Sequence, residues 1–234
     1  MNIAKARVLV TGGTSGIGKA TALALAESGA RVAICGRNRE TVEKAASEID
    51  ASPFVCDVSH ESDVLAMIPK VVKALGGYDV LVNNAGFGRF APLIETTADD
   101  MRAVWETNVL GATLVARESA RHFIAQSAGN IVNVASTAGS RGSVGGSAYS
   151  SSKFALSSLT ECWRLELRKH NIRVMQVNPS EVLTDFAHRA RGAARQDNPS
   201  KLRGSDIAAT IVSMLSQDDR AMVTDVTVWA TNPT

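Results

Sequence analysis

The sequence has 234 residues, of which 45% are hydrophobic, and a net charge of +2 at neutral pH. This length and composition predict one large globular domain with a buried core and exclude a disordered chain. The 25 basic and 23 acidic side chains nearly balance, so nothing indicates a nucleic-acid or membrane partner. Three cysteines without CxxC spacing predict neither a disulfide framework nor a zinc site. We expect a cytoplasmic protein, because the sequence shows neither a signal peptide nor a membrane-spanning run.

Short β-branched runs alternate with longer helical patterns along the chain. The first strand is expected at residues 7–10 and the second at 31–35, with a helix over 19–29 between them. Later strands are expected in the segments 54–58, 79–86, 130–136, 173–179 and 223–230. Helices are expected over 41–49, 63–75, 99–126, 148–169 and 205–216. This alternation predicts a parallel sheet with helices on both faces.

Right-handed crossovers make such a sheet doubly wound, as in a single Rossmann-type α/β domain over residues 1–234. Ligands bind these sheets at the carboxyl ends of the strands. The one long irregular stretch, residues 183–204, is rich in arginine, alanine and polar residues. A loop of that length in a compact domain is typical of a lid, and we expect it to cover a substrate.

A glycine cluster, TGGTSGIG at residues 11–18, joins the first strand to the first helix. Gly12, Gly16 and Gly18 leave no side chains between the backbone and a pyrophosphate, and the helix N-terminus offers unpaired N–H groups. A glycine cluster is also compatible with an ordinary tight turn. Its place after the first strand favours a dinucleotide site.

The end of the second strand bears on which dinucleotide binds. An NAD site usually has an acidic residue there that accepts from the ribose 2′-hydroxyl. This sequence has Gly36 and then Arg37, whose guanidinium pairs well with a 2′-phosphate. The pattern favours NADP(H), although a solvated surface arginine is the alternative.

Tyr149 and Lys153 are four residues apart in YSSSK, a spacing that places both on one helical face. A tyrosine has an ordinary pKa of about 10, and a nearby ammonium lowers it. Tyr149 would then exchange a proton with a substrate oxygen. Ser136, at the end of a predicted strand, would hydrogen-bond that oxygen, or it would serve only as a cap.

These motifs in this order, together with NNAG (83–86) and Asn108 in TNVLG, resemble the classical short-chain dehydrogenase/reductase family over nearly the whole chain. The resemblance implies a catalytic tetrad of Asn108, Ser136, Tyr149 and Lys153. It implies that the cofactor is held by Gly12, Thr14, Ser15, Gly16, Ile17, Gly18, Arg37, Asp57, Val58, Asn84, Ala85, Gly86, Tyr149, Lys153, Pro179, Val182 and Thr184. From the residues alone, Asp57 is equally a cap, and NNAG is equally a turn.

The sequence departs from the family at Ser180, where the family has a glycine, and this puts the local backbone in doubt if a positive φ is needed. The C-terminal segment also lacks the aspartate–glycine–glycine pattern of many tetrameric members. The two long central helices are those that form the dimer bundle in the family. We therefore expect a homodimer or a homotetramer.

Substrate contacts are expected from Ser136, Tyr149, Phe87, Val144 and Phe186, and Phe87 and Val144 are equally compatible with ordinary packing. The arginines and the lysine of 183–204 would attract an anionic or carrier-linked substrate, such as an acyl carrier protein or coenzyme A derivative, or they would simply face solvent. The four histidines have no metal-ligand spacing, and we expect no metal.

The resulting hypothesis is an NADPH-dependent reduction of a ketone, aldehyde or 3-oxoacyl group to an alcohol, or the reverse oxidation. The relatives with the most similar overall pattern are 3-oxoacyl-acyl carrier protein reductases and carbonyl reductases. The alternatives are a catalytically silent NADPH-binding regulatory protein and a dehydrogenase of sugars or polyols. An epimerase or dehydratase of nucleotide-sugars is disfavoured, because those relatives carry a larger C-terminal substrate domain.

Overall fold

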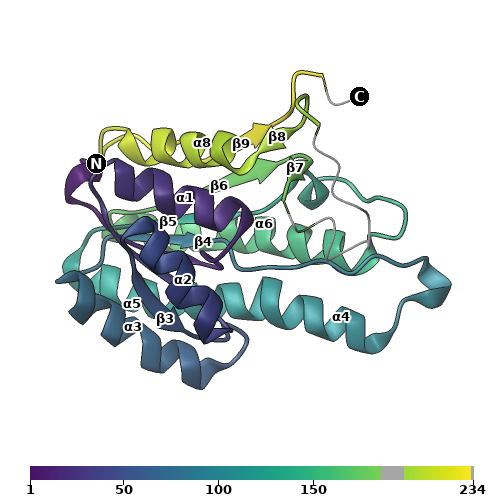
Figure 1. The fold of residues 1–234 in the computed structure, drawn as a ribbon, viewed down its shortest axis with the longest axis horizontal. Helices are drawn as coiled ribbons and strands as arrows, with labels where there is room; N and C mark the ends of the chain where they lie inside the picture. The colour runs from purple at the N-terminus through teal and green to yellow at the C-terminus, as the bar shows by residue number, and fades with distance from the viewer. Residues whose placement is uncertain (185, 187–197, 233–234) are drawn as a thin grey trace.

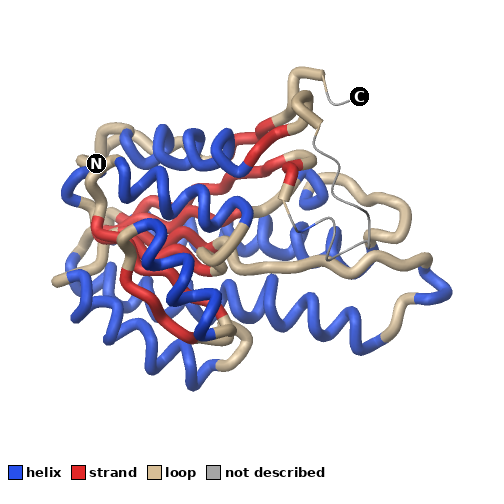
Figure 2. The backbone as a smooth tube through the Cα atoms, in the orientation of Figure 1, coloured by secondary structure: helices blue, strands red, loops and turns tan. Residues whose placement is uncertain are grey.

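The computed structural model describes residues 1–184, 186 and 198–232. A seven-stranded parallel sheet runs through its centre in the order β3-β2-β1-β4-β5-β6-β9 (Figures 1 and 2). The strands are β1 (Arg7–Thr11), β2 (Arg31–Gly36), β3 (Ser52–Val55), β4 (Val80–Asn83), β5 (Gly129–Val134), β6 (Ile172–Pro179) and β9 (Asp225–Val228). A separate parallel pair joins β7 (Val182–Leu183) to β8 (Leu202–Arg203). The strand order confirms the predicted doubly wound Rossmann-type fold.

Helices cover both faces of this sheet. They are α1 (Gly16–Glu27), α2 (Arg39–Ile49), α3 (Glu61–Leu75), α4 (Ala98–Trp105), α5 (Ala112–Gln126), α6 (Ser147–Leu167) and α8 (Gly204–Ser216). Helices α1 and α8 lie side by side above the sheet in Figure 1, and α3 and α5 lie below it. Short helical turns connect these elements: η1 (Ile3–Lys5), η2 (Leu93–Glu95), η3 (Glu106–Gly111), η4 (Thr137–Gly139) and η5 (Arg168–His170).

The strands are hydrophobic on both sides because each side is buried under helices. Val8 and Val10 of β1 pack in one core with residues of α1, α2 and α8. Leu9, between them, packs in a second core with residues of α3 and α5. The alternation follows from the pleat of a strand, which sends successive side chains to opposite faces. Because both faces of these strands are buried, nearly every residue along them is apolar.

Several elements differ from the sequence-based expectation, among them β4, which ends at Asn83 rather than at residue 86. The third strand lies at Ser52–Val55 rather than at 54–58, because Asp57 is already in a turn in which its carboxylate accepts from the backbone and hydroxyl of Ser59. The expected single helix over 99–126 is divided into α4, a π-helical turn (η3) and α5. Such turns accommodate one extra residue inside a helix and often occur at functional sites.

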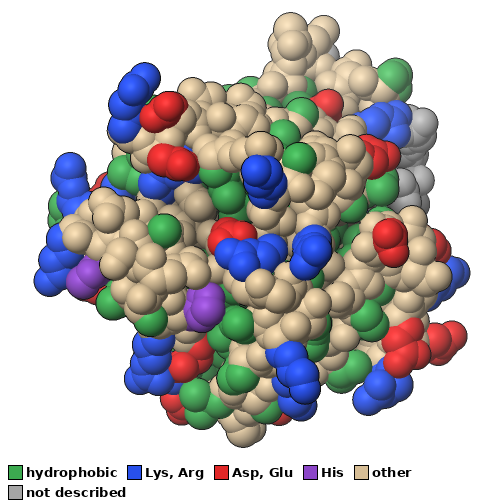
Figure 3. All heavy atoms as spheres, turned by 90° about the vertical axis from the view of Figure 1, so that its left-hand side faces the viewer, with side chains coloured by type: hydrophobic (Ala, Val, Ile, Leu, Met, Phe, Trp, Pro, Cys, Tyr) green, Lys and Arg blue, Asp and Glu red, His purple; other side chains and the backbone are tan. Residues whose placement is uncertain are grey.

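The face that contains the N-terminus carries basic and acidic side chains interspersed with one another (Figure 3). Within the described residues, no helix combines the length and the apolar character needed to cross a bilayer.

Candidate active site

The predicted site residues follow the carboxyl ends of neighbouring strands. The glycine loop follows β1, the NNAG segment follows β4, Ser136 follows β5, and Pro179 ends β6. Parallel strands bring these ends to one edge of the sheet, where doubly wound folds bind their ligands. The fold therefore gathers at one edge segments that lie far apart in the sequence.

The glycine loop forms a tight cradle at the start of α1. Gly12 and Gly16 have positive φ values of 63° and 55°, which side-chain-bearing residues rarely adopt. A Cβ atom on Gly18 would lie only 2.3 Å from the carbonyl oxygen of Gly12. Ser15, at the N-cap of α1, makes no side-chain capping hydrogen bond to the first turn. The loop therefore presents bare backbone at a helix N-terminus, which suits a phosphate group.

Thr11 ties the glycine loop to the NNAG segment, a role that sequence reasoning missed. Its buried hydroxyl accepts from the backbone N–H groups of Asn84 and Ala85, both at 2.9 Å. The Asn84 amide donates back to the carbonyls of Thr11 at 2.9 Å and Gly12 at 3.2 Å. This reciprocal clamp fixes one segment against the other. The only sequence signal was a threonine where the strand enters the loop.

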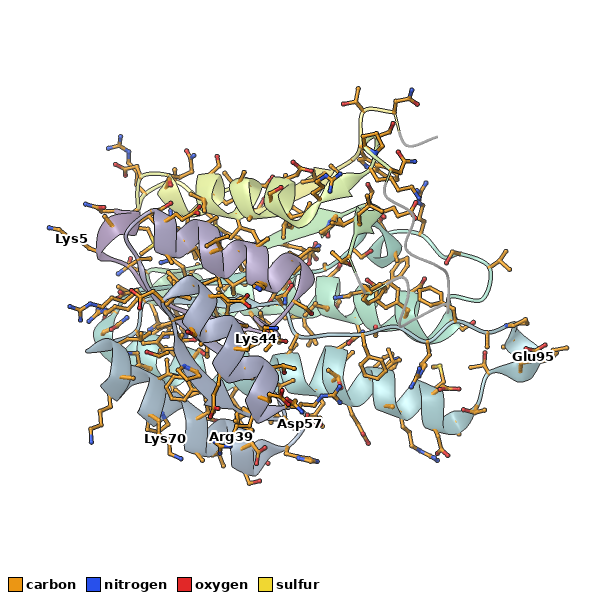
Figure 4. All side chains as sticks on the ribbon, viewed as in Figure 1. Lys5, Arg39, Lys44, Asp57, Lys70 and Glu95 are labelled. Carbon is orange, nitrogen blue, oxygen red and sulfur yellow. The ribbon has the colours of Figure 1, made fainter. Side chains whose placement is uncertain are left out.

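The far end of the cradle contains the residues predicted to select the cofactor. Arg37 is exposed just after β2, and the side chain of Thr14 lies beside Gly36. Burial alone would raise the pKa of Asp57, but hydrogen bonds from Ser59 and the charge of Arg37 hold it below its usual range. In Figure 4, Asp57 is labelled beside the end of α2 from which that helix starts. Arg37 and the ionised Asp57 therefore lie near each other at this end of the cradle.

Helix α6 places Tyr149 and Lys153 one turn apart, as the spacing predicted. The Lys153 ammonium nitrogen lies 5.8 Å from the centroid of the Tyr149 ring. Lys153 is 5% exposed, and its Nζ donates to the carbonyl of Val134 at 2.9 Å. Burial lowers the pKa of Lys153 from 10.5 to about 8. A buried ammonium group therefore lies near the Tyr149 ring.

Asn108 lies in the π-helical turn and links α6 to the loop after β4. Its Oδ1 accepts from the backbone N–H of Phe87 at 3.0 Å, and its Nδ2 donates to the Phe87 carbonyl at 2.9 Å. The same Nδ2 donates to the hydroxyl of Ser152 at 3.0 Å. The Ser152 hydroxyl donates in turn to the Tyr149 carbonyl at 2.7 Å. Ser152 is thus a buried support of this site that the sequence pattern did not identify.

Ser136 caps the short turn η4, where its Oγ accepts from the backbone N–H of Ala138 at 3.1 Å. The prediction that Ser136 caps a turn is therefore confirmed. An accepted bond leaves the hydroxyl proton able to donate elsewhere. Ser136 can therefore cap the turn and also donate a hydrogen bond to a substrate oxygen.

The apolar residues predicted to contact substrate lie in different surroundings, and Phe186 is the one packed against Tyr149. The Phe186 ring packs against Tyr149 with a centroid distance of 5.2 Å, and Phe90, which the sequence reasoning missed, packs against Tyr149 at 5.5 Å. Phe87 faces Arg89 instead, whose guanidinium lies 5.8 Å from its ring centre. Val144 is 99% exposed on its loop, so its predicted substrate contact has no support from packing.

The segment after β6 borders the glycine cradle. A cavity of about 250 Å³ lies between them, and its lining includes Gly16, Thr184 and Arg203. Ser180 donates its backbone N–H to Val228 at 2.9 Å, and among the described residues it is not one of those with positive φ. Its replacement of the family's glycine therefore causes no backbone strain. Of the basic residues predicted for the lid, Arg189, Arg191 and Arg195 lie outside the described residues, whereas Lys201 pairs with Glu181 at 2.7 Å.

The strand order, with the candidate site residues gathered at the carboxyl ends of the strands, defines a Rossmann-type fold. Comparison with known proteins gives its family. The short chain dehydrogenase family model matches residues 6–195. The chain therefore belongs to the short-chain dehydrogenase family, which comprises oxidoreductases that bind nicotinamide cofactors.

Individual relatives agree with this assignment. Carbonyl reductase family member 4 of Xenopus laevis is 37% identical over 178 residues, which cover 76% of this chain and 75% of that protein. The 3-oxoacyl-[acyl-carrier-protein] reductase FabG of Thermotoga maritima is 33% identical over 226 residues, 92% of each chain. The crystal structure of a short-chain type dehydrogenase/reductase from Mycobacterium marinum superposes with a TM-score of 0.90 at 29% identity, covering 99% of this chain and 98% of that one.

Proposed function

We propose that this protein is an NADPH-dependent reductase that converts a ketone, aldehyde or 3-oxoacyl group to an alcohol, and that it can run the reverse oxidation. The observation that carries the proposal is the pairing of Tyr149 with the buried Lys153 ammonium at the ligand edge of the sheet. The relatives named as carbonyl reductase and 3-oxoacyl-[acyl-carrier-protein] reductase support the choice of a carbonyl substrate.

The residues present fit a dinucleotide. The bare backbone of the glycine cradle would hold the pyrophosphate, and the residues after β6 would line the nicotinamide side. When bound, the reduced nicotinamide supplies the hydride, which leaves the protein to position the substrate and supply the proton. The residues proposed to hold the cofactor are Gly12, Thr14, Ser15, Gly16, Ile17, Gly18, Arg37, Asp57, Val58, Asn84, Ala85, Gly86, Tyr149, Lys153, Pro179, Val182 and Thr184.

Tyr149 acts as the proton donor in this proposal. The Lys153 ammonium favours the phenolate over the phenol and so makes Tyr149 a stronger acid. The Ser136 hydroxyl donates to the substrate oxygen, where negative charge develops during reduction. Asn108 holds the Phe87 backbone and Ser152 and thereby keeps α6 in place beside the strand ends. Tyr149 and Ser136 would act on the substrate oxygen, Lys153 on Tyr149, and Asn108 only through the position of α6.

A Gly18→Ala substitution tests the cradle. Its Cβ would meet the backbone oxygen of Gly12, so the loop must shift, and we expect NADPH affinity to fall at least about 10-fold. The matched control is Gly142→Ala, because a Cβ on Gly142 would meet no atom within 4 Å. Titration of NADPH fluorescence measures both. Equal affinity in the two variants would show that the cradle does not hold the cofactor.

Arg37 accounts for the preference for NADPH over NADH in this proposal. Charge-assisted hydrogen bonds contribute about 1.5–3 kcal/mol, so Arg37→Ala should raise the Kd for NADPH about 10- to 100-fold. The Kd for NADH should change much less, because NADH lacks the 2′-phosphate. The control is Arg39→Ala, a nearby exposed arginine that pairs with Glu43. A wild-type preference for NADH would refute this assignment.

We also propose that the protein forms a homodimer or homotetramer in the cytoplasm and that residues 183–204 act as its substrate lid within a single catalytic domain. Half-exposed to exposed apolar side chains on the outer helices support the association, with Trp105 39%, Phe154 45% and Leu165 69% exposed. A substrate linked to an acyl carrier protein or coenzyme A would meet the basic residues of that lid.

The decisive test of the function is a panel of ketones, aldehydes, 3-oxoacyl esters and sugars, assayed for NADPH consumption and repeated with NADH. We expect turnover with at least one carbonyl class and with NADPH. Tight NADPH binding without turnover across the panel would instead indicate the regulatory alternative, and turnover confined to sugars or polyols would indicate a polyol dehydrogenase.

A further inference from the structure

The start of α8 lies against the glycine cradle. Figure 1 shows α1 and α8 side by side. A Cβ on Gly204 would lie only 3.1 Å from the Gly16 carbonyl oxygen and 3.1 Å from the Ala20 Cβ. Because Gly204 has no side chain, the first turn of α8 can approach the first turn of α1 this closely. The preceding residue, Arg203, is thereby held at the border of the cradle.

Arg203 is the charged residue of the cavity of about 250 Å³ that opens between the two helices. The cavity is lined by Gly16, Ala20, Leu183, Thr184, Arg203, Gly204 and Ser205. Among these described residues only Arg203 carries a charge, and no carboxylate in the lining opposes it. Gly16 belongs to the bare backbone that we propose to hold a pyrophosphate. A guanidinium beside that backbone suits a phosphate group, because its planar fork can pair with two phosphate oxygens.

The backbone of Arg203 is held by two elements. It is in register with Leu183 in the parallel pair of β7 and β8. Its N–H donates to the Asp206 carboxylate at 2.7 Å, which caps the first turn of α8. Lys201, two residues earlier, pairs instead with Glu181 at 2.7 Å. Of these two basic residues, Arg203 is therefore the one that borders the cofactor side.

Arg203 and Arg37 lie on opposite sides of β1. Arg37 follows β2, which neighbours β1 on one side in the strand order. The cavity that Arg203 lines is bordered by Thr184, from the segment after β6 on the other side. In the proposed binding mode, the adenosine half of the dinucleotide lies on the Arg37 side and the nicotinamide half on the Thr184 side. Arg203 is therefore placed near the pyrophosphate and away from the 2′-phosphate.

We propose that Arg203 binds the pyrophosphate of the dinucleotide, chiefly the phosphate on the nicotinamide side, as a cofactor-binding residue outside the glycine motif. This inference rests on the proposed dinucleotide site. It assigns Arg203 to the cofactor and not to the basic residues that would attract an anionic substrate. NADPH and NADH carry the same pyrophosphate. Arg203 thus contributes equally to the binding of both, in contrast to Arg37.

The test measures the Kd for each dinucleotide by titration of NADPH or NADH fluorescence. Arg203→Ala should raise both Kd values by a similar factor of about 10, the effect of losing charge-assisted hydrogen bonds. Arg203→Lys keeps the charge but loses the fork, and its Kd values should be intermediate. The matched control is Arg220→Ala, which removes an exposed arginine beyond the opposite end of α8 and should leave both Kd values within about 2-fold. Circular dichroism melting confirms that each variant is folded.

Two fragments of the cofactor locate the contact. Adenosine 2′,5′-bisphosphate ends at the phosphate on the adenine side, whereas 2′-phospho-ADP-ribose carries the whole pyrophosphate. Calorimetry of Arg203→Ala should show the Kd for 2′-phospho-ADP-ribose raised about 10-fold and the Kd for the bisphosphate changed much less. Arg37→Ala should weaken both fragments, because both carry the 2′-phosphate. An equal loss for both fragments in Arg203→Ala would contradict a contact on the nicotinamide side.

Two results with the whole dinucleotides would overturn the proposal. One is Kd values that Arg203→Ala leaves unchanged; a raised KM for an anionic ketone in that variant would then assign Arg203 to the substrate. The other is a loss confined to NADPH, which would assign Arg203 to the 2′-phosphate.

These binding measurements separate the inference from the proposed function, because they need no turnover. If Arg203→Ala weakens binding of both dinucleotides but no carbonyl is reduced, the reductase function fails while the pyrophosphate contact stands. If Gly18→Ala weakens binding and Arg203→Ala does not, the cradle stands and this inference fails. If the wild type binds neither dinucleotide, both proposals fail.

Discussion

Replacing Tyr149 with phenylalanine should lower kcat for carbonyl reduction by about 100- to 10,000-fold, the usual contribution of a positioned general acid. The substitution removes only the hydroxyl, so the ring contacts with Phe90 and Phe186 persist. NADPH affinity should therefore stay within about 3-fold of wild type. Stopped-flow measurement of NADPH oxidation under single-turnover conditions gives the rate of the chemical step. Fluorescence titration gives the Kd for NADPH.

The chain contains its own matched control for this substitution, because its only other tyrosine is Tyr78. Tyr78 is fully buried between the sheet and α5, where its hydroxyl bonds to Ser119 at 2.9 Å. Tyr78→Phe should lower the free energy of unfolding by about 1 kcal/mol and leave kcat unchanged. If Tyr149→Phe kept the wild-type rate, Tyr149 would not be the proton donor.

A Lys153→Met substitution should abolish most activity and also change how stability depends on pH. Without the ammonium, Tyr149 loses the neighbouring positive charge that favours proton transfer in the proposed mechanism, and we expect kcat to fall at least about 100-fold. Methionine fills a similar volume but leaves the Val134 carbonyl without its donor, which costs about 1–3 kcal/mol at any pH. The pH-dependent part comes from the ammonium itself.

The sign of that pH effect follows from the depressed pKa of Lys153, about 8 against an ordinary 10.5. Below pH 8 the lysine is charged in both the folded and the unfolded protein, and its burial costs stability. Between pH 8 and 10.5 the unfolded protein binds more protons, so wild-type stability rises with pH relative to Lys153→Met. The full difference is about 3 kcal/mol, because each pKa unit corresponds to about 1.36 kcal/mol. Urea unfolding of both proteins from pH 7.5 to 10.5 measures it.

A difference between the two proteins that stays constant over this pH range would mean that burial does not depress the pKa of Lys153. The same comparison is repeated in the Tyr149→Phe background, where the pH-dependent difference made by Lys153→Met should persist because no phenol at position 149 is left to ionise. Comparison of the variants thereby separates the lysine's ionisation from the loss of the phenol.

The alternation of strands and helices made the doubly wound parallel sheet predictable, and local spacing identified several candidate site residues. The glycine loop was identified because backbone next to phosphate tolerates few side chains, and Tyr149 and Lys153 because a helical turn has a fixed length. These are short-range rules that act within a few residues. They need no knowledge of how distant segments meet.

The unpredicted parts of the site all depend on contacts between distant segments. The clamp of Thr11 on Asn84 spans 73 residues, and the Asn108 bond to Ser152 spans 44. The π-helical turn around Asn108 has no spacing signal of its own, since the flanking helical pattern is continuous. Phe90 looked like any loop aromatic until the fold brought it to Tyr149. Sequence reasoning thus identified candidate residues from local motifs but not the long-range contacts that hold them.

The most direct test of the proposed mechanism is to trace the hydride from NADPH to the alcohol product. The enzyme is incubated with NADPH carrying deuterium at both C4 positions and the ketone from the panel that turns over fastest, and the alcohol is analysed by mass spectrometry. We predict one deuterium on the carbinol carbon of the alcohol, and we expect Tyr149→Phe to form this labelled alcohol about 100- to 10,000-fold more slowly than wild type. An alcohol without deuterium, or labelled alcohol formed equally fast by both proteins, would contradict the proposed mechanism.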